Sequence, residues 1–376
     1  MAPVDRRAVL AGAVAATLAP RPAPAAGACP AAPVRPSLAT LASQRGILFG
    51  MGLTASALQQ LPRLRAVALA ESGMLVPGIE LKWAQVEPQP GRFDFAPADR
   101  ILDEARQAGL KARGHALLWH EALPAEVAQT RSPAAMAALV RTHIRTVCAR
   151  YAGLLHSWDV VNEAIEPGPD RPQGLRRTPF FEALGEGYID RAFALAAEAD
   201  ASAILTLNEY DLELDTPWHA SRRAAMLELL NRLVRRNVPV RALGIQGHLA
   251  PGRPGVLKPE IFAAFLRDVA SLGLTIFITE FDVVDRDLPA PVPQRDAAAA
   301  QAARDYLAVA LAEPAVTALV TWGVSDADNW VDGNDQFRRR DGLPARPNPY
   351  DDAYCPKPLR GAIADALRAA PDRRVR

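Results

Sequence analysis

Short runs rich in β-branched and other apolar residues alternate with longer helical runs along most of this 376-residue chain, and this alternation limits its fold more than any other feature. The longer runs are rich in Ala, Leu and Arg, and several end at Gly or Asn, as helices often do. The short runs have the length and composition of strands: 47–53, 75–83, 111–119, 157–163, 202–210, 242–249, 275–283 and 318–325. These β-then-α units predict an α/β protein, a single-domain (β/α)8 TIM barrel.

An open, doubly wound sheet is the alternative architecture, because it also alternates strands with helices. That fold usually carries a glycine-rich phosphate loop after an early strand. The segment LFGMGL at 48–53 has two glycines but lacks the GxGxxG spacing. We therefore favour the barrel.

The N-terminal segment 1–30 differs from the rest of the chain. Arg6 and Arg7 precede an apolar run at 8–18, and a Pro/Ala-rich stretch with small residues follows. This pattern is typical of a twin-arginine export signal and predicts a periplasmic or secreted protein, with the folded domain at 31–376. A disordered Ala/Pro tail is the alternative interpretation.

The charge and hydropathy of the remaining chain exclude several kinds of partner. With a formal net charge of +1, the chain has no basic surplus that would favour nucleic acid. No apolar window beyond the N-terminal region is long enough to span a membrane. We expect a monomer, and nothing in the sequence implies a metal or a cofactor.

Three cysteines occur, and none has the spacing of a metal site. Cys148 lies in a helical pattern and is expected to be a core thiol. If Cys29 survives processing, it could pair with Cys355, because a closed barrel brings its two ends together. Cys29 is also a candidate for lipidation, although the usual Leu three positions earlier is missing.

Polar and aromatic residues collect where the expected strands end. In a barrel of this type the C-terminal strand ends form the active face. A single polar strand end often satisfies only the loop backbone, but seven such ends on one face indicate a site. These residues are Glu80, Lys82, Trp83, His115, Trp119, His120, Asn162, Glu163, Asn208, Glu209, Tyr210, Gln246, His248, Thr279, Glu280, Trp322, Asp326 and Trp330.

Two glutamates narrow the chemistry. Glu163 ends the fourth expected strand and Glu280 lies near the end of the seventh, so their carboxylates can face each other across the barrel mouth. Paired carboxylates about 5–5.5 Å apart are the catalytic groups of retaining glycosidases, in which one is held protonated and the other ionised. Trp and Tyr rings suit the CH faces of sugars, while amides, His and Lys suit sugar hydroxyls.

Six motifs in order resemble those of family-10 glycoside hydrolases, the endo-β-1,4-xylanases, over about residues 45–365. They are RGHALLWH at 113–120, WDVVNEA at 158–164, LGEGYIDRAF at 184–193, GIQGHL at 244–249, ITEFDV at 278–283 and TWGVSDADNW at 321–330. The resemblance implies a TIM-barrel catalytic domain at 31–376. It also implies hydrolysis of internal bonds of xylan or xylo-oligosaccharides by double displacement, without a cofactor.

The resemblance further implies roles for individual residues. Glu163 matches the general acid/base and Glu280 the nucleophile. Asn162 matches the amide that holds the 2-hydroxyl of the sugar being cleaved, and His248 the imidazole that helps keep the nucleophile ionised. The other matching positions are expected to contact or wall the substrate: Lys82, His115, Trp119, His120, Asn208, Tyr210, Gln246, Trp322 and Trp330.

Some of these residues also have structural interpretations. His115 and His120 are five residues apart in a strand context, which is a poor match to a zinc site, and His120 fits a supporting role as well as sugar contact. Asp159 and Asp282 follow the strand alternation and are expected to be buried partners of the site.

The chain departs from the family pattern on the second expected strand. In PGIELKW, Gly78 and Ile79 stand where the family usually carries Glu and Asn, which bind the second sugar on the non-reducing side. Losing two or three neutral hydrogen bonds, at about 0.5–1.5 kcal/mol each, would weaken transition-state binding there. Glu126, Glu209 and Asp211 are further departures.

Two other functions remain open on these residues. Asn-Glu on the fourth strand and Glu on the seventh are shared by cellulases and mannanases of the same barrel superfamily, although RGHALLWH and GIQGHL favour a xylanase. A non-catalytic carbohydrate-binding protein is the second alternative. The presence of both glutamates, Asn162 and His248 argues against it.

Overall fold

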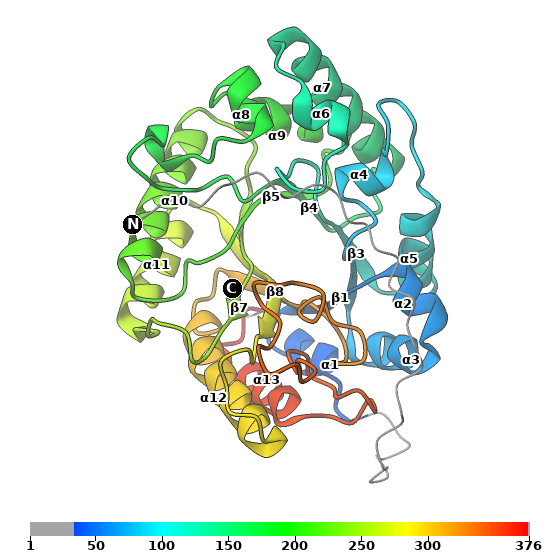
Figure 1. The fold of residues 1–376 in the computed structure, drawn as a ribbon, viewed down its shortest axis with the longest axis vertical. Coiled ribbons are helices and arrows are strands. Elements are labelled where there is room, and N and C mark those ends of the chain that lie inside the picture. Colours follow the sequence, from blue (N-terminus) through cyan, green and yellow to red (C-terminus); the bar gives the residue numbers. More distant parts are fainter. Residues whose placement is uncertain (1–33, 375–376) are drawn as a thin grey trace.

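Eight parallel strands close into a barrel in the computed structural model, which describes residues 34–374. Each strand pairs with the next around the ring, and β9 pairs with β1 to close it (Figure 1). The strands are β1 (Leu48–Leu53), β2 (Met74–Pro77), β3 (Lys111–Gly114), β4 (Ser157–Asn162), β5 (Ile204–Glu209), β6 (Ala242–Ile245), β8 (Thr275–Val283) and β9 (Val316–Thr321). A short strand, β7 (His248–Leu249), pairs with β8. The predicted (β/α)8 barrel is confirmed.

Helices surround the barrel on its outside, as Figure 1 shows. Their buried faces follow the spacing of apolar residues; on α7, Met136, Val140, Ile144 and Val147 are all buried. The helices are α1 (Leu38–Ser43), α2 (Ala55–Gln60), α3 (Pro62–Glu71), α4 (Trp83–Val86), α5 (Ala96–Gln107), α6 (Ala125–Gln129), α7 (Pro133–Arg150), α8 (Pro179–Leu184), α9 (Tyr188–Ala199), α10 (Pro217–Arg235), α11 (Pro259–Ser271), α12 (Val292–Ala310) and α13 (Pro358–Ala369), with a 3₁₀ turn η1 (Pro172–Gly174).

Local sequence sets where several of these helices begin. The side chains of Thr54, Ser132, Thr178 and Thr216 accept hydrogen bonds from backbone N–H groups in the first turns of α2, α7, α8 and α10. Such caps satisfy N–H groups that have no partner within the helix. Proline follows the cap directly in α7, α8 and α10, where its fixed φ suits the first helical position.

The structure ends three of the predicted strands earlier than the sequence pattern suggests. β2 stops at Pro77, β3 at Gly114 and β9 at Thr321, rather than at 83, 119 and 325. The predicted strand 242–249 is also divided into β6 and β7, because Gly247 takes a left-handed φ of 77° between them. Apolar residues continue past these points because the loops are themselves buried, so the pattern does not reveal the turn.

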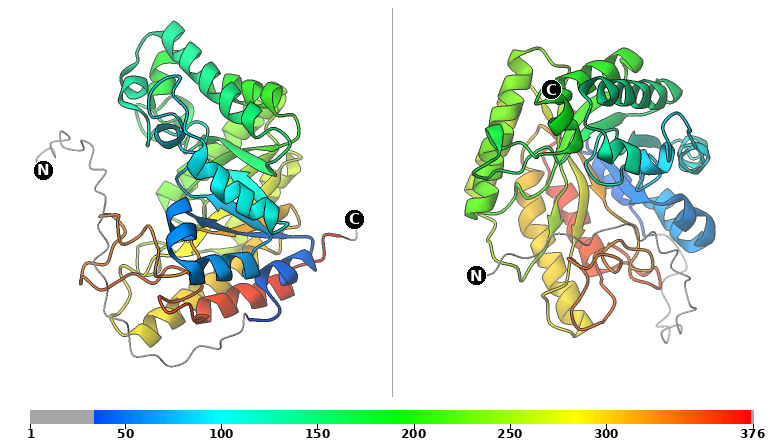
Figure 2. Two further views of the ribbon diagram at one scale, coloured as in Figure 1. Left: turned by 90° about the vertical axis from the view of Figure 1, so that its right-hand side faces the viewer. Right: turned by 45° about the horizontal axis from the view of Figure 1, so that its top comes forward.

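Ion pairs fix the segment 322–357 that connects β9 to α13. Figure 2 shows this segment, in orange, extending from the barrel. Lys357 Nζ lies 2.9 Å from Asp326 Oδ2, and Arg346 Nη2 lies 2.8 Å from Asp296 Oδ2 on α12. All four side chains are at least mostly buried, so these charges are largely removed from water and compensate one another.

The two ends of the described chain lie together on the barrel. The guanidinium of Arg360 on α13 donates to the carbonyl of Pro36 at 2.9 Å, and α13 packs beside α1. Cys148 is a free, buried thiol, as predicted, and Cys355 is disulfide-bonded. Cys29 lies outside the described residues.

The predicted export segment, residues 1–30, also lies outside the described residues. Export, lipidation of Cys29 and the monomeric state therefore stay predictions. Among residues 34–374, none of the helices combines the length and the apolar character that crossing a bilayer requires.

Candidate active site

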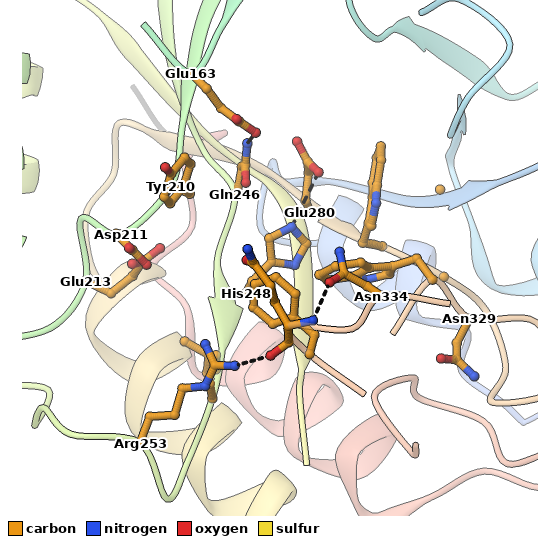
Figure 3. Close-up of a pocket in the computed structure, with 18 of the residues that line it drawn as sticks. Glu163, Tyr210, Asp211, Glu213, Gln246, His248, Arg253, Glu280, Asn329 and Asn334 are labelled. Carbon is orange, nitrogen blue, oxygen red and sulfur yellow. Dashed lines mark hydrogen bonds and ion pairs between the residues drawn. The ribbon is translucent and has the colours of Figure 1, made fainter. Parts of the chain in front are cut away.

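A cavity of about 1000 Å³ opens at the C-terminal ends of the barrel strands. Each of the eight barrel strands, or the loop after it, contributes to its lining. Figure 3 shows Glu163, Gln246, Glu280 and His248 facing the same space. The predicted site residues that line the cavity are Lys82, His115, Trp119, Asn162, Glu163, Tyr210, Gln246, His248, Glu280, Trp322 and Trp330.

Neutral amides donate hydrogen bonds to the Glu163 carboxylate, which directly follows β4. Its Oε1 accepts hydrogen bonds from the amides of Gln246 at 3.0 Å and Asn162 at 3.2 Å. The Nδ1 atom of His120 lies 4.0 Å from Oε2. Burial, followed by the positive charge of Arg176, lowers the pKa of His120 to about 3, so this imidazole is neutral at ordinary pH. The side chain of Glu163 remains 13% exposed, and the cavity gives it access to solvent and ligand.

Arg176 holds the backbone from which the Glu163 side chain extends. Glu163 has a φ of 59°, a left-handed conformation that costs a non-glycine residue about 1–3 kcal/mol unless the surroundings enforce it. Arg176 Nε donates to the Glu163 carbonyl at 2.9 Å, and its Nη2 donates to the Tyr210 hydroxyl at 2.7 Å. The loop after β4 is thereby tied to the end of β5, and the carboxylate is aimed into the cavity.

The Glu280 carboxylate is buried among donors and cations. It lies on β8, and its Oε1 accepts from the amide of Asn208 at 2.8 Å. His248 Nε2 lies 3.4 Å from Oε2, and His115 Nδ1 lies 3.9 Å from Oε1. Burial alone would raise the pKa of Glu280, but His115, His248 and Lys82 together lower it to about 2. Glu280 is therefore an anion at any ordinary pH.

Buried carboxylates behind the two histidines fix their orientation. His248 Nδ1 lies 2.9 Å from Asp282 Oδ1, and Trp330 Nε1 donates to the other oxygen at 2.7 Å. Burial opposes protonation of His248, but the charge and hydrogen bond of Asp282, together with Glu280, raise its pKa to about 10. His115 Nδ1 lies 3.0 Å from Asp159 Oδ2. The prediction that both aspartates are buried partners of the site is confirmed.

Asn208 occupies a different place from the one predicted. It is fully buried and does not line the cavity, so it is not positioned as a substrate contact. Its Nδ2 donates both to Glu280 Oε1 and to Asn162 Oδ1, each at 2.8 Å, and its Oδ1 accepts from Thr279 at 2.6 Å. Asn208 therefore links the anion on β8 to the amide beside Glu163. Its side chain is enclosed by these three partners, which explains the error.

Aromatic and cationic side chains form the remaining walls. The ammonium of Lys82 lies 4.6 Å from the centroid of the Trp119 ring, and Trp322 meets His115 edge-on with centroids 5.0 Å apart. His120 does not line the cavity and stands edge-on to Trp119, which favours its supporting role. These groups offer ring faces and hydrogen-bond donors, as expected for a sugar-binding site.

The departures noted at Gly78 and Ile79 fall within the same cavity. Both residues line it, and Ile79 is 43% exposed, so an apolar side chain faces the cavity there. A Cβ atom built on Gly78 would meet its first neighbour, the Leu53 carbonyl, at an ordinary 3.4 Å. The backbone therefore has room for a side chain at position 78.

Several cavity residues escaped the sequence analysis. Asp211, Glu213, His219 and Arg253 line the cavity, and Figure 3 places Asp211 and Glu213 together on the β5 side. They lie in loops or at a helix start, where no strand periodicity marks their direction. Of these residues, Asp211 alone carries a signal in the sequence, its departure from the family pattern.

Replacing Asp282 by Asn is expected to lower the pKa of His248 from about 10 by at least about one unit, because the ring loses the negative charge that stabilises its protonated form. The imidazole then gives up its proton at a lower pH, which an NMR titration of its ring signals follows directly. Trp330→Phe is the matched control, because it removes the other hydrogen bond to Asp282 without removing the charge, and it should change this pKa less. A pKa of His248 that stays in place, or rises, in Asp282→Asn would contradict this electrostatic role.

Comparison with known proteins adds independent information. The model of the family described as glycosyl hydrolase family 10 matches residues 37–366. A β-1,4-xylanase of Dictyoglomus thermophilum is 34% identical over 265 residues, covering 68% of this chain and 72% of the relative. Endo-1,4-β-xylanase B of Thermotoga neapolitana is 30% identical over 322 residues, covering 85% of this chain and 87% of the relative.

Solved structures agree with this similarity. Xylanase 10B of Thermotoga petrophila RKU-1, crystallised in complex with xylobiose, superposes with a TM-score of 0.78 at 28% identity, covering 88% of this chain and 97% of that one. Native xylanase 10B of Thermotoga maritima superposes with a TM-score of 0.78 at 29% identity, covering 88% of this chain and 98% of that one.

Proposed function

Because the chain belongs to glycosyl hydrolase family 10, we propose that it is an endo-β-1,4-xylanase that cleaves internal bonds of xylan or xylo-oligosaccharides with retention of configuration. The observation that carries the proposal is the pair of carboxylates in one cavity with unlike surroundings. Glu280 is a buried anion beside His248, whereas the donors to the Glu163 carboxylate are two neutral amides. Such a difference is what separates a nucleophile from an acid/base in a retaining glycosidase.

In the first step, a Glu280 oxygen attacks the anomeric carbon while Glu163 gives its proton to the departing glycosidic oxygen. The C–O bond to the leaving sugar breaks, and a glycosyl ester forms on Glu280. The hydrogen bond from Asn208 and the nearby His248 orient the attacking carboxylate. We expect Asn162, whose amide donates to Glu163, to hold the 2-hydroxyl of the sugar that reacts.

In the second step, Glu163 is ionised and takes a proton from a water molecule that attacks the ester. The sugar leaves with the configuration it had in the substrate, Glu280 is again an anion, and Glu163 is again protonated. Every proton in this cycle passes through Glu163. Its exposure to the cavity suits this role, because both the leaving group and the incoming water approach from there.

The substrate preference is tested by the release of reducing sugar from three polymers under the same conditions. We expect rapid release from xylan and slow or no release from mannan and carboxymethylcellulose. Faster release from either of the latter would favour a cellulase or mannanase. No release from any polymer, or from an aryl xylobioside, would favour a non-catalytic carbohydrate-binding protein.

We further propose that the second glycone subsite is weak. The cavity wall there carries Gly78, which has no side chain, and exposed Ile79, which offers a sugar hydroxyl no hydrogen bond. The loss of transition-state binding is confined to sugars that reach this wall, since the groups around Glu163 and Glu280 lie elsewhere in the cavity. We consequently expect a smaller loss of catalytic efficiency on decorated or short substrates than on plain xylan chains.

The double variant Gly78→Glu, Ile79→Asn is expected to raise kcat/KM on xylotetraose by about tenfold or more, by adding two or three hydrogen bonds worth about 0.5–1.5 kcal/mol each. The space beside the Gly78 Cα accepts a side chain, so the fold should be preserved. An aryl monoxyloside, which does not reach this subsite, is the control substrate and should be unaffected. An unchanged rate on xylotetraose, or an equal gain on both substrates, would contradict the weak subsite.

A further inference from the structure

Three side chains with metal-binding atoms meet on the β5 side of the cavity. Asp211 and Glu213 lie in the loop after β5, and His219 lies in the first turn of α10. One ligand atom from each residue lies within 4.8 Å of the other two. All three residues line the cavity, and in Figure 3 Asp211 and Glu213 lie together.

Glu213 is the member of this cluster whose environment most needs explanation. It is only 5% exposed, and its Oε2 accepts from the Leu212 N–H at 2.8 Å. Its Oε1 is buried and has no hydrogen-bond partner among the described residues. Burial, followed by the charge of Asp211, raises the pKa of Glu213 to about 7. A buried oxygen left without a partner costs about 1–3 kcal/mol, and a cation at this point would satisfy it.

The other two donors are already oriented by neighbouring side chains. His219 Nδ1 lies 2.6 Å from the Thr216 hydroxyl, which leaves Nε2 to face Asp211 Oδ1 at 3.8 Å. Asp211 Oδ2 accepts from Trp218 Nε1 at 2.9 Å, which leaves Oδ1 free for the cluster. Metal-binding side chains are typically held in this way, through the atom that does not bind the metal.

Arg223, whose charge acts on Glu213, does not form an ion pair with the cluster. The guanidinium of Arg223 donates to the carbonyls of Leu212 and Leu214, at 3.1 and 2.6 Å. Among residues 34–374, no ion pair joins Arg223 to Asp211 or Glu213. The two carboxylates therefore face His219 without a direct cationic partner.

We propose that Asp211, Glu213 and His219 bind a divalent transition-metal ion, with Zn²⁺ as the best match. One imidazole and two carboxylates are donors that Zn²⁺ accepts, whereas Ca²⁺ requires about six to eight oxygen ligands. Ligand bonds to Zn²⁺ are about 2.0–2.2 Å long, so the donors must draw closer than they now stand. Asp211, with a side chain 41% exposed, is able to make this movement. Water from the cavity would fill the remaining positions.

The test is titration of the chelator-treated, full-length protein with Zn²⁺ by calorimetry, and with Co²⁺ by visible absorption. We expect one saturable site per chain for both ions, and at least tenfold weaker binding in Glu213→Gln and in His219→Gln. Asp211→Asn, which changes a more exposed residue, should also weaken binding and guards against a folding defect in the buried variants. Asp215→Asn is the matched control, because Asp215 lies in the same loop but pairs with Lys258 and is outside the cluster.

The outcomes are distinguishable. Loss of binding in all three cluster variants, with binding kept in Asp215→Asn and unchanged melting temperatures without metal, would support the site. No saturable binding by the folded wild-type protein would overturn it, as would equal binding by wild type and all variants. Metal binding is measured here without any sugar substrate, so its failure would leave the proposed glycosidase activity untouched.

Discussion

Glu280→Gln is expected to lower kcat/KM on xylan by at least about 10⁴-fold, because an amide cannot form the glycosyl ester. The substitution keeps the size and shape of the side chain, so the cavity and the hydrogen bond to Asn208 need little rearrangement. Initial rates of reducing-sugar release, measured at several xylan concentrations, give the change directly. The thermal unfolding midpoint verifies that the variant is folded.

The matched control for this variant is Glu198→Gln, which makes the same chemical change on the exposed face of α9. Glu198 pairs with Arg145 at the surface, and its side chain is 58% exposed. Activity in this control should stay within about twofold of wild type, since surface substitutions of this kind have small effects. If Glu280→Gln retained more than a tenth of the wild-type rate, Glu280 would not be the nucleophile.

Glu163→Ala should lower kcat/KM on xylan by about 10²- to 10⁴-fold, the range usual for loss of a general acid. Substrates with a good leaving group, such as a dinitrophenyl xylobioside, need no protonation and should still form the glycosyl ester. Release of that ester should be slow, because no base remains to activate water. Azide, a nucleophile that needs no base, should restore turnover and give a β-glycosyl azide.

The comparison between the two variants is informative in itself. Azide should have no such effect on Glu280→Gln, since that variant forms no ester for azide to attack. A Glu163→Ala protein that lost xylan and dinitrophenyl xylobioside activity equally, and that did not respond to azide, would contradict the acid/base role. Arg176, which holds the Glu163 backbone, is unchanged in this experiment.

The barrel and its two key carboxylates were predictable because both depend on patterns that the chain repeats. Strand composition alternating with helical periodicity determines the fold class, and the last residues of each strand determine which side chains reach the mouth. Glu163 and Glu280 follow directly from these rules. The family resemblance added their distinct roles, which strand position alone does not separate.

The direction of side chains past the strand ends was much less predictable. The sequence predicts Asn208 at the substrate, but its side chain is fully buried and bridges the two halves of the site. The contact of Arg176 with the Glu163 carbonyl joins residues from a loop and a strand end, and no periodicity encodes it. The cluster of Asp211, Glu213 and His219 likewise forms only when the loop after β5 folds back onto α10.

Covalent trapping tests the central claim most directly. A dinitrophenyl 2-deoxy-2-fluoro-β-xylobioside should inactivate the enzyme over time. The fluorine slows both the formation and the hydrolysis of the glycosyl ester, whereas the dinitrophenyl leaving group speeds only its formation, so the ester accumulates. We expect one added fluoroxylobiosyl group per chain, located by peptide mass spectrometry on Glu280 and absent from the Glu280→Gln protein. Labelling of Glu163 or of any other residue, or inactivation without a covalent adduct, would contradict it.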